Sequence, residues 1–284
     1  MTLLVVGTVP AEPGAVISGE VSMNGAGLRV GNRVIPPCQG TAAMLLAALA
    51  ATDAVGAPAP HAVLGGDIGK GDGTRAAYEA LPAYHEACRA SVVAFHYLQP
   101  VMAFMRHAVE YLAEKDALLV ADAGGMYAAR GAGLAARFEL MTPDVGEVGF
   151  MADPAATHPA YVSHYLFGQA EFDPERLAQL AWESGGSSRV LLIKGETDRV
   201  CVEGRVIGTV SAPDVPTLEA IGGTGDTITG LSAGLLAGGM SAEEAALVAA
   251  RCNRLAGERI AARPSHRASE LAGAFPAVLS ELLA

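Results

Sequence analysis

Short runs of aliphatic and β-branched residues recur along the chain, separated by longer segments with helical patterns. Each short run is continuously hydrophobic, which predicts a strand buried on both faces of a mostly parallel sheet. Strands that alternate with helices in this way are typical of βαβ units. The predicted strands are Leu3–Gly7, Ala62–Gly65, Val92–Phe95, Leu118–Ala121, Phe138–Met141 and Val190–Ile193.

Helical patterns fill most of the intervening sequence. The predicted helices are Gly40–Thr52, Thr74–Arg89, Gln99–Glu114, Pro174–Glu183, Asp226–Leu236, Ala242–Ala262 and Ala268–Leu283. Two further apolar runs, Val200–Val202 and Arg205–Val210, are joined by Glu203-Gly204 and predict an antiparallel hairpin at one sheet edge. No linker rich in Pro, Gly or Ser divides the chain, so residues 1–284 are expected to form a single domain. Residues 9–60 are rich in Gly, Pro and Ala and predict little besides one helix.

Composition narrows the class of protein. Of the 284 residues 51% are hydrophobic and 17% charged, which supplies a large core and excludes disorder. A net charge of −11 repels phosphate backbones and argues against nucleic acid as a partner. The N-terminal stretch lacks a basic segment, and the longest apolar run, Ala42 to Ala51, could not cross a bilayer. Four scattered cysteines argue against zinc and against disulfides, so a reducing cytoplasm is expected.

The strongest chemical signal is Gly222-Gly223-Thr224-Gly225-Asp226, immediately before an apolar helix. A glycine-rich turn lets several backbone N–H groups converge on one point, and the helix adds its positive end there. An anion such as a transferable phosphate would bind at this point, and Asp226 beside it could take a proton from an attacking hydroxyl. The competing interpretation is an ordinary glycine turn with Asp226 as a helix cap.

Polar clusters follow the ends of four predicted strands. They are Gly66–Gly73, Asp122–Gly125, Thr142–Glu147 and Lys194-Gly195. In open α/β sheets the site lies outside the C-terminal ends of the strands, so these clusters are expected to meet there. Asp67, Gly69 and Asp122 are candidates for holding substrate hydroxyls, although each aspartate could equally form a turn.

The third and fourth clusters each allow two interpretations. Asp144 and Glu147 have the spacing of a capping box at a helix start. Glu147 could also orient Mg²⁺ through water, because this ion keeps much of its hydration shell. Lys194 closes an apolar strand, where a lysine either serves a function or extends its ammonium group to the surface.

Three of these segments together resemble one family. They are the TPxxGE stretch at Thr142–Glu147, Lys194-Gly195, and GGTGDTITG at Gly222–Gly230. They look like the NAD(P)H-hydrate dehydratase branch of the ribokinase-like superfamily, over roughly residues 60–265. The resemblance implies a three-layer α/β/α sandwich with a mostly parallel central sheet, an antiparallel edge hairpin and no separate lid. It also implies that ATP or ADP phosphorylates the hydroxyl of a hydrated nicotinamide ring, after which phosphate leaves.

The resemblance assigns roles by position. Asp226 would be the base, Gly223, Thr224 and Gly225 the anion hole, Lys194 and Gly195 neighbours of the nucleotide, and Asp144 and Glu147 would face substrate or Mg²⁺. Two departures affect the acceptor. Asp144-Val145 stands where the branch has His-Pro, and the loop Gly66–Gly73 is longer and more acidic than usual.

Two other functions compete with this one. Acidic Asp67, Asp72 and Asp144 suit a kinase for a sugar or another small alcohol. The missing N-terminal substrate segment of the family would suit a non-catalytic nucleotide-binding or metabolite-sensing protein. In each case the expected partners are a nucleotide and a small molecule, with neither nucleic acid nor membrane. The apolar composition and small-residue helices predict a homo-oligomer.

Overall fold

A computed structural model of the chain describes residues 1–25, 27–156 and 173–284. The described strands form one eleven-stranded sheet in the order β11-β10-β9-β8-β7-β6-β1-β5-β2-β3-β4. The strands are β1 (Leu3–Val9), β2 (Val16–Asn24), β3 (Gly27–Val30), β4 (Arg33–Ile35), β5 (His61–Gly66), β6 (Val92–His96), β7 (Leu118–Ala121), β8 (Leu140–Met141), β9 (Val190–Ile193), β10 (Asp198–Val202) and β11 (Arg205–Val210). The six central strands, from β5 to β9 in this order, run parallel.

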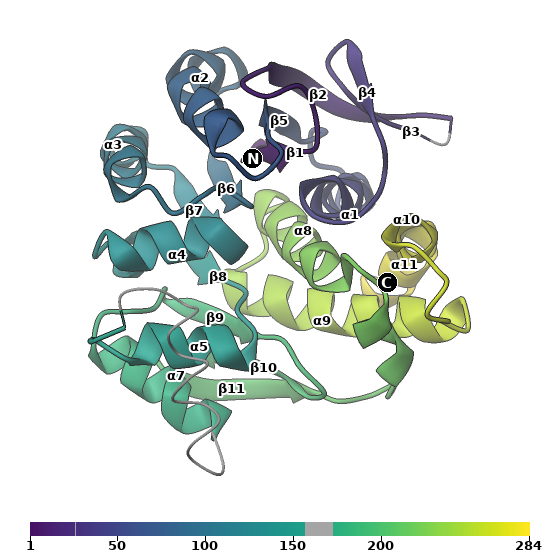
Figure 1. Cartoon of the computed structure of the whole chain (residues 1–284). Coiled ribbons are helices and arrows are strands. Elements are labelled where there is room, and N and C mark those ends of the chain that lie inside the picture. Colours follow the sequence, from purple (N-terminus) through teal and green to yellow (C-terminus); the bar gives the residue numbers. More distant parts are fainter. Residues whose placement is uncertain (26, 157–172) are drawn as a thin grey trace.

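Helices cover both faces of the sheet, which gives three layers (Figure 1). One face carries α2 (Asp72–Cys88), α3 (Met102–Ala113), α4 (Ala123–Gly131), α5 (Val145–Ala152) and α7 (Pro174–Glu183). The other carries α1 (Thr41–Ala54), α8 (Thr224–Ala237), α9 (Ala242–Arg259), α10 (Ala268–Ala272) and α11 (Phe275–Leu282). The predicted α/β/α sandwich is confirmed.

The hydrophobic runs are continuous because the side chains of each central strand point alternately into the two hydrophobic cores, one on each face of the sheet. Along β1, Leu3 and Val5 pack against the α1/α8 layer, whereas Leu4 and Val6 pack against the α2/α3 layer. All four side chains are fully buried. Burial of a side chain of this size contributes about 1.5–3 kcal/mol, so every position of such a strand stabilises the fold.

The predicted hairpin is β10–β11, which pairs antiparallel to β9 at one edge. The antiparallel strands β2, β3 and β4 at the other edge were not predicted, nor were the short helices α4 and α5. In β2 buried and exposed positions alternate, and a strand with one wet face gives no continuous apolar run. The single helix predicted over Ala268–Leu283 is wrong. It is interrupted at Gly273, and Pro276 is accommodated only because it lies in the first turn of α11.

Helix α8 packs unusually close to α1 because it carries glycines on the shared face. A Cβ on Gly230 would overlap the Met44 carbonyl, and one on Gly234 would lie 2.7 Å from the Ala51 Cβ. This close approach places the turn before α8 directly beside Gly40, at the start of α1.

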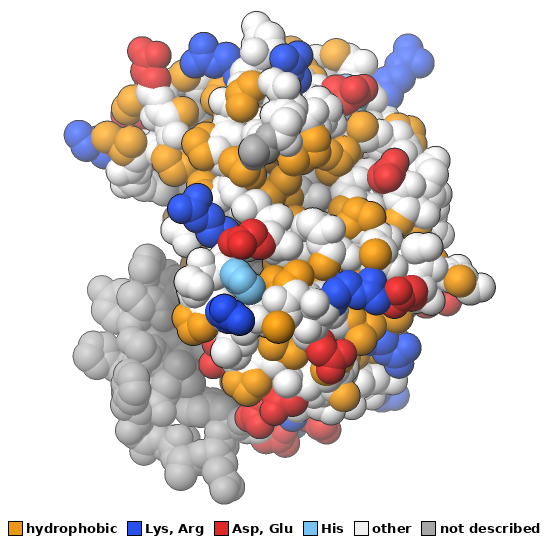
Figure 2. Space-filling model, turned by 90° about the vertical axis from the view of Figure 1, so that its right-hand side faces the viewer, with side chains coloured by type: hydrophobic (Ala, Val, Ile, Leu, Met, Phe, Trp, Pro, Cys, Tyr) orange, Lys and Arg blue, Asp and Glu red, His pale blue; other side chains and the backbone are white. Residues whose placement is uncertain are grey.

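The surface carries both signs of charge. On the described part of the face in Figure 2, basic side chains stand singly or in small groups among acidic and apolar ones, without the continuous basic stripe of a nucleic-acid binder. Among the described helices, none combines the length and apolar character that crossing a bilayer requires.

Candidate functional site

The turn before α8 has the geometry of an anion site. Gly223 is left-handed (φ 98°, ψ −2°), and the hydroxyl of Thr224 donates to the carbonyls of Leu218 (3.0 Å) and Ile221 (3.2 Å). Thr224 therefore fixes the turn with its side chain. The N–H groups of Gly225 and Asp226 have no acceptor among the described residues, so they are available to an anion at the positive end of a 14-residue helix.

Asp226 lies in the first turn of α8 and lines a cavity. Its Oδ2 accepts the N–H of Gly40 at 2.7 Å, and its Oδ1 is 3.1 Å from His96 Nε2. His96 is fully buried at the end of β6, with Nδ1 3.1 Å from the hydroxyl of Thr41. The carboxylate is thus held from two sides at the edge of the cavity, where it can meet a hydroxyl group.

A buried ion pair lies beside this carboxylate. Lys194 Nζ is 3.0 and 3.1 Å from the two oxygens of Asp122, and Thr229 donates to the same carboxylate at 2.6 Å. Burial raises the pKa of Asp122, but the charge of Lys194, together with the neighbouring His96 and Thr229, outweighs this effect and holds that pKa below its ordinary value. Burial lowers the pKa of Lys194, and Asp122 and Glu147 more than reverse this effect. Both groups are therefore charged at neutral pH, each because of the other.

Lys194 also reaches the anion site. Its Nζ lies 3.5 Å from the position that a Cβ would take on Gly225. Gly195, predicted to approach a nucleotide, uses its backbone within the chain: its N–H donates to Asp198 (3.1 Å) and its carbonyl accepts from Arg254 (2.8 Å). Asp122 likewise caps α4 through the Ala123 N–H, so its oxygens are already occupied.

The capping box predicted at Asp144 and Glu147 is present in full. Asp144 accepts the N–H of Glu147 at 2.8 Å, and Glu147 accepts that of Asp144 at 2.8 Å. The other oxygen of Glu147 accepts from the Tyr127 hydroxyl. Burial and the neighbouring charge of Asp122 raise the pKa of Glu147 to about 7, despite the opposing effect of Lys194.

Asp67 forms the loop that precedes α2. One of its oxygens accepts the N–H groups of Gly69, Lys70 and Gly71, and the other accepts those of Gly73 and Thr74. Slight burial raises its pKa, but these backbone donors lower it below the ordinary value. The turn-forming interpretation accounts for this carboxylate, although it and Gly69 still line the cavity.

The cavity next to Asp226 has a volume of about 760 Å³. Six segments form its wall, and one residue of each is Thr8, Gly40, Gly69, Tyr97, Gly223 and Arg267. Tyr97 has a positive φ of 51°, is half exposed, and its ring centroid lies 4.6 Å from that of His96. Strained backbone of this kind persists where the surrounding structure holds it, and here it places an aromatic residue in the wall of the cavity.

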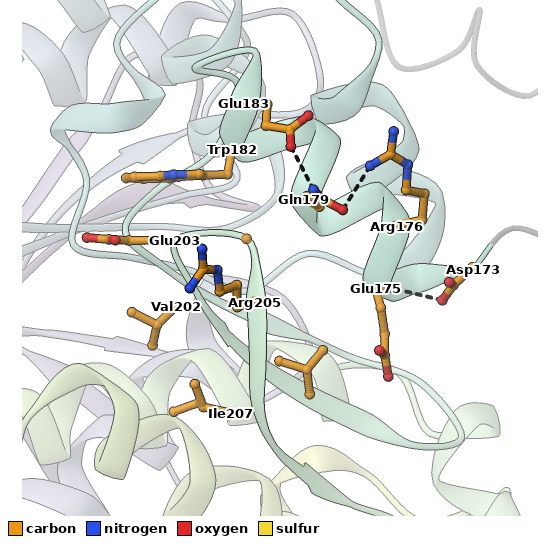
Figure 3. A pocket seen from close by; sticks show the side chains of 12 residues that line it. Asp173, Glu175, Arg176, Gln179, Trp182, Glu183, Val202, Glu203, Arg205 and Ile207 are labelled. Carbon is orange, nitrogen blue, oxygen red and sulfur yellow. Dashed lines mark hydrogen bonds between the residues drawn. The ribbon is translucent and has the colours of Figure 1, made fainter.

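A second cavity of about 900 Å³ lies between α7 and the β10–β11 hairpin (Figure 3). Arg176, Gln179 and Glu183 are hydrogen-bonded in series along α7 at its rim, at 2.8 and 2.7 Å. This cavity shares no lining residue with the first and contains none of the predicted site residues. Although this cavity is larger, it is therefore not the candidate site.

Comparison with known proteins assigns the chain to a family. Residues 100–276, more than half of the chain, match the family model described as NAD(P)H-hydrate dehydratase. The chain belongs to the NAD(P)H-hydrate dehydratase family. Asp122, Lys194 and Asp226 fall inside the matched stretch of this family member. The resemblance found in the sequence, and the enzyme class it implies, are confirmed.

Relatives of this NAD(P)H-hydrate dehydratase family member occur in archaea. An uncharacterized protein of Methanocaldococcus jannaschii is 34% identical over 220 residues, which cover 77% of the chain and 90% of that protein. The ADP-dependent (S)-NAD(P)H-hydrate dehydratase of Cenarchaeum symbiosum is 33% identical over 172 residues, which cover 59% of the chain and 54% of that enzyme. A ribokinase-like superfamily protein of Enterococcus faecalis has a TM-score of 0.59 at 15% identity, covers 99% of the chain and 86% of that protein, and confirms the fold.

The sequence predicted most of the residues of this candidate site but missed part of it. His96 and Tyr97 were not singled out, nor were Gly40 and Thr41. His96 follows a predicted strand, so the strand-end argument that selected Asp122 would also have selected it. The amide of Gly40 carried no signal, because a backbone donor is revealed only by the packing of α1 against α8.

Proposed function

We propose that this protein is a nucleotide-dependent NAD(P)H-hydrate dehydratase in which Asp226 is the base. One observation supports this above all. The Asp226 carboxylate lies between an open cavity and an anion site formed by the Gly225 and Asp226 amides and the Lys194 ammonium group. An acceptor hydroxyl from one side and a phosphoryl group from the other would meet at this carboxylate.

The proposed reaction has two steps. Asp226 accepts the proton of the hydroxyl on the hydrated ring as that oxygen bonds to the terminal phosphorus of ATP or ADP, while the bond to the leaving nucleotide breaks. Lys194 and the two amides stabilise the charge on the transferred group. The phosphate then leaves with its bonding electrons, and loss of a ring proton restores the double bond of NADH or NADPH. In this proposal Gly223, Thr224 and Gly225 shape the anion hole.

The residues present also suit Mg²⁺. Glu147 has a raised pKa because it is buried and because the carboxylates of Asp122 and Asp144 lie nearby, and a divalent cation would relieve that repulsion. In this proposal Glu147 would orient the ion through water, with Asp144 beside it. The ion would supply positive charge to the nucleotide phosphates. Lys194 and Gly195 would approach the same nucleotide, and Asp67, Gly69 and Asp122 would border the acceptor.

The test is turnover of the full chain with hydrated NADH or NADPH and either ATP or ADP. We expect recovery of the reduced cofactor's absorbance together with release of inorganic phosphate. Failure with both nucleotides would remove the proposal. A phosphorylated product that accumulates without elimination would favour the kinase for a sugar or small alcohol. That alternative depended on Asp67, Asp72 and Asp144, of which Asp67 and Asp144 are engaged in backbone hydrogen bonds.

Substitution of Gly223 by alanine is expected to damage the anion site. Alanine there would adopt φ 98° and place its Cβ 3.1 Å from atoms of Ala43 and Ala268. Gly239 is a matched control, because it has the same φ of 98° with nothing within 4 Å. Gly239→Ala should cost about 1–3 kcal/mol of backbone strain. In urea unfolding Gly223→Ala should cost more than its control, and calorimetry should show weaker nucleotide binding in Gly223→Ala alone. Equal effects would contradict this assignment.

The raised pKa of Glu147 predicts a pH-dependent stability. In metal-free buffer the unfolded chain releases the Glu147 proton near pH 4.5, whereas the folded chain keeps it until about pH 7. The free energy of unfolding should therefore fall as pH rises through this window. Glu147→Gln keeps a cap acceptor without the charge, so it should match the wild type at acid pH and exceed it by about 1–3 kcal/mol at higher pH. The free energy of unfolding of both proteins is measured in urea at several pH values. A difference between them that stays constant across this pH range would contradict the prediction.

Three expectations stay predictions. The single domain, the cytoplasmic location and the homo-oligomer all follow from composition and pattern. Light scattering of the purified chain at micromolar concentration would test the last of them, and a monomer would contradict it.

A further inference from the structure

Both oxygens of the proposed base are fixed by hydrogen bonds from different elements. Gly40 holds Oδ2 from the start of α1, and His96 holds Oδ1 from the end of β6. An ionised carboxylate can only accept, so His96 Nε2 must carry the hydrogen. In neutral His96, Nδ1 is then an acceptor, and the Thr41 hydroxyl lies 3.1 Å away to donate to it. Thr41 therefore favours the tautomer of His96 with hydrogen on Nε2, which donates to Asp226.

We infer that His96 is a positioning residue that orients the Asp226 carboxylate for proton transfer from the acceptor hydroxyl. This inference rests on the proposed function and adds a residue to it. His96, Thr41 and Gly40 precede residue 100, so they lie outside the stretch that matches the family model. The matched stretch includes Asp226 and none of these three residues.

The surroundings of His96 favour this role over that of an independent base. Its side chain is fully buried, so the ring reaches solvent and substrate only through its neighbours. Asp226 faces it at 3.1 Å, Asp122 lies 3.9 Å from the same nitrogen, and the Tyr97 ring covers another side. Lys194 forms an ion pair with Asp122. Asp226 is therefore the carboxylate to which His96 donates its hydrogen bond. His96 thereby joins the base to the ion pair at the anion site.

The experiment compares His96→Leu and His96→Gln with a control histidine. Leucine removes the donor at similar volume, whereas the glutamine amide can reach Asp226 from nearly the position of Nε2. His85 is the matched control: it is also buried, it bonds the Ala90 carbonyl (2.9 Å) and the Tyr111 hydroxyl (3.2 Å), and it lies outside the site. His85→Leu reports the cost of deleting a buried, hydrogen-bonded imidazole without any contact to Asp226.

We expect His96→Leu to lower kcat about 10–100-fold, with KM for nucleotide and acceptor changed less than about 3-fold. His96→Gln should recover most of kcat, and His85→Leu should keep the wild-type kcat at comparable loss of Tm. A kcat for His96→Leu equal to that of His85→Leu would overturn the inference. So would an equal kcat for His96→Leu and His96→Gln.

Two measurements remain decisive even if the proposed function fails. NMR of the ¹⁵N-labelled chain should show hydrogen on Nε2 of His96, and a neutral ring with hydrogen on Nδ1 alone would overturn the inference. A crystal structure of His96→Leu should show the Asp226 carboxylate rotated from its wild-type orientation, and an unchanged carboxylate would also overturn it. Inactivity of the wild type toward hydrated NADH would instead remove only the proposed substrate.

Discussion

Asp226→Asn should lower kcat by about 10²–10⁴-fold, the usual contribution of a general base, while the protein stays folded. The asparagine oxygen can still accept from Gly40, and the His96 ring can present an acceptor nitrogen to the new amide. The change therefore removes the proton acceptor and leaves the contacts. Steady-state turnover with saturating nucleotide measures it.

Nucleotide affinity is the control for this variant. The anion site uses the amides of Gly225 and Asp226, whose geometry the substitution does not alter, so Kd for ATP or ADP should stay within a few-fold of the wild type. A variant that keeps wild-type kcat would remove Asp226 from its assigned role. A variant that loses nucleotide binding together with kcat would indicate a collapsed turn and would be examined by Tm.

Lys194→Met should impair both stability and turnover. It leaves the Asp122 carboxylate buried beside other acidic groups without its cation, and loss of one partner of a buried ion pair typically costs about 3–5 kcal/mol. It also removes the ammonium group next to Gly225, so turnover should fall by at least about 10²-fold. Urea unfolding and phosphate release measure the two effects.

A double variant separates these effects. Asp122→Asn combined with Lys194→Met removes the uncompensated charge, and Thr229 can still donate to the asparagine oxygen. We expect most of the lost stability to return while turnover stays low. If the double variant were as unstable as Lys194→Met alone, the ion pair would not be the source of the loss. If turnover returned, Lys194 would have no part in phosphoryl transfer.

The sequence predicted the central sheet well because its signal is local. A strand that is buried on both faces has to be hydrophobic throughout, as residues 3–6 are. A continuous hydrophobic run in the sequence therefore predicts such a strand directly. The edge strands gave weaker signals, because one face of β2 meets water and tolerates polar residues. The helix break before Pro276 was available in the sequence and was outweighed by the apolar periodicity around it.

The site followed the same division. The turn at Gly223 and the strand-end position of Lys194 could be predicted because both depend on local backbone geometry. What each side chain does depends on long-range partners. Asp122 is occupied by Lys194, which lies far away in sequence, and nothing near Asp122 revealed this. Asp67 is the exception, because the N–H groups of its own loop occupy it, as in the turn-forming alternative. The assigned roles of these residues in binding substrate, nucleotide and metal stay predictions.

The glycine-lined contact between α1 and α8 restricts how this enzyme could be redesigned. Because Gly230 and Gly234 leave no room between the helices, any bulkier residue would push α1 away and move the Gly40 amide away from the Asp226 carboxylate. New acceptors should therefore be sought by varying the loop around Gly69, which lines the same cavity and lies outside the contact between the two helices.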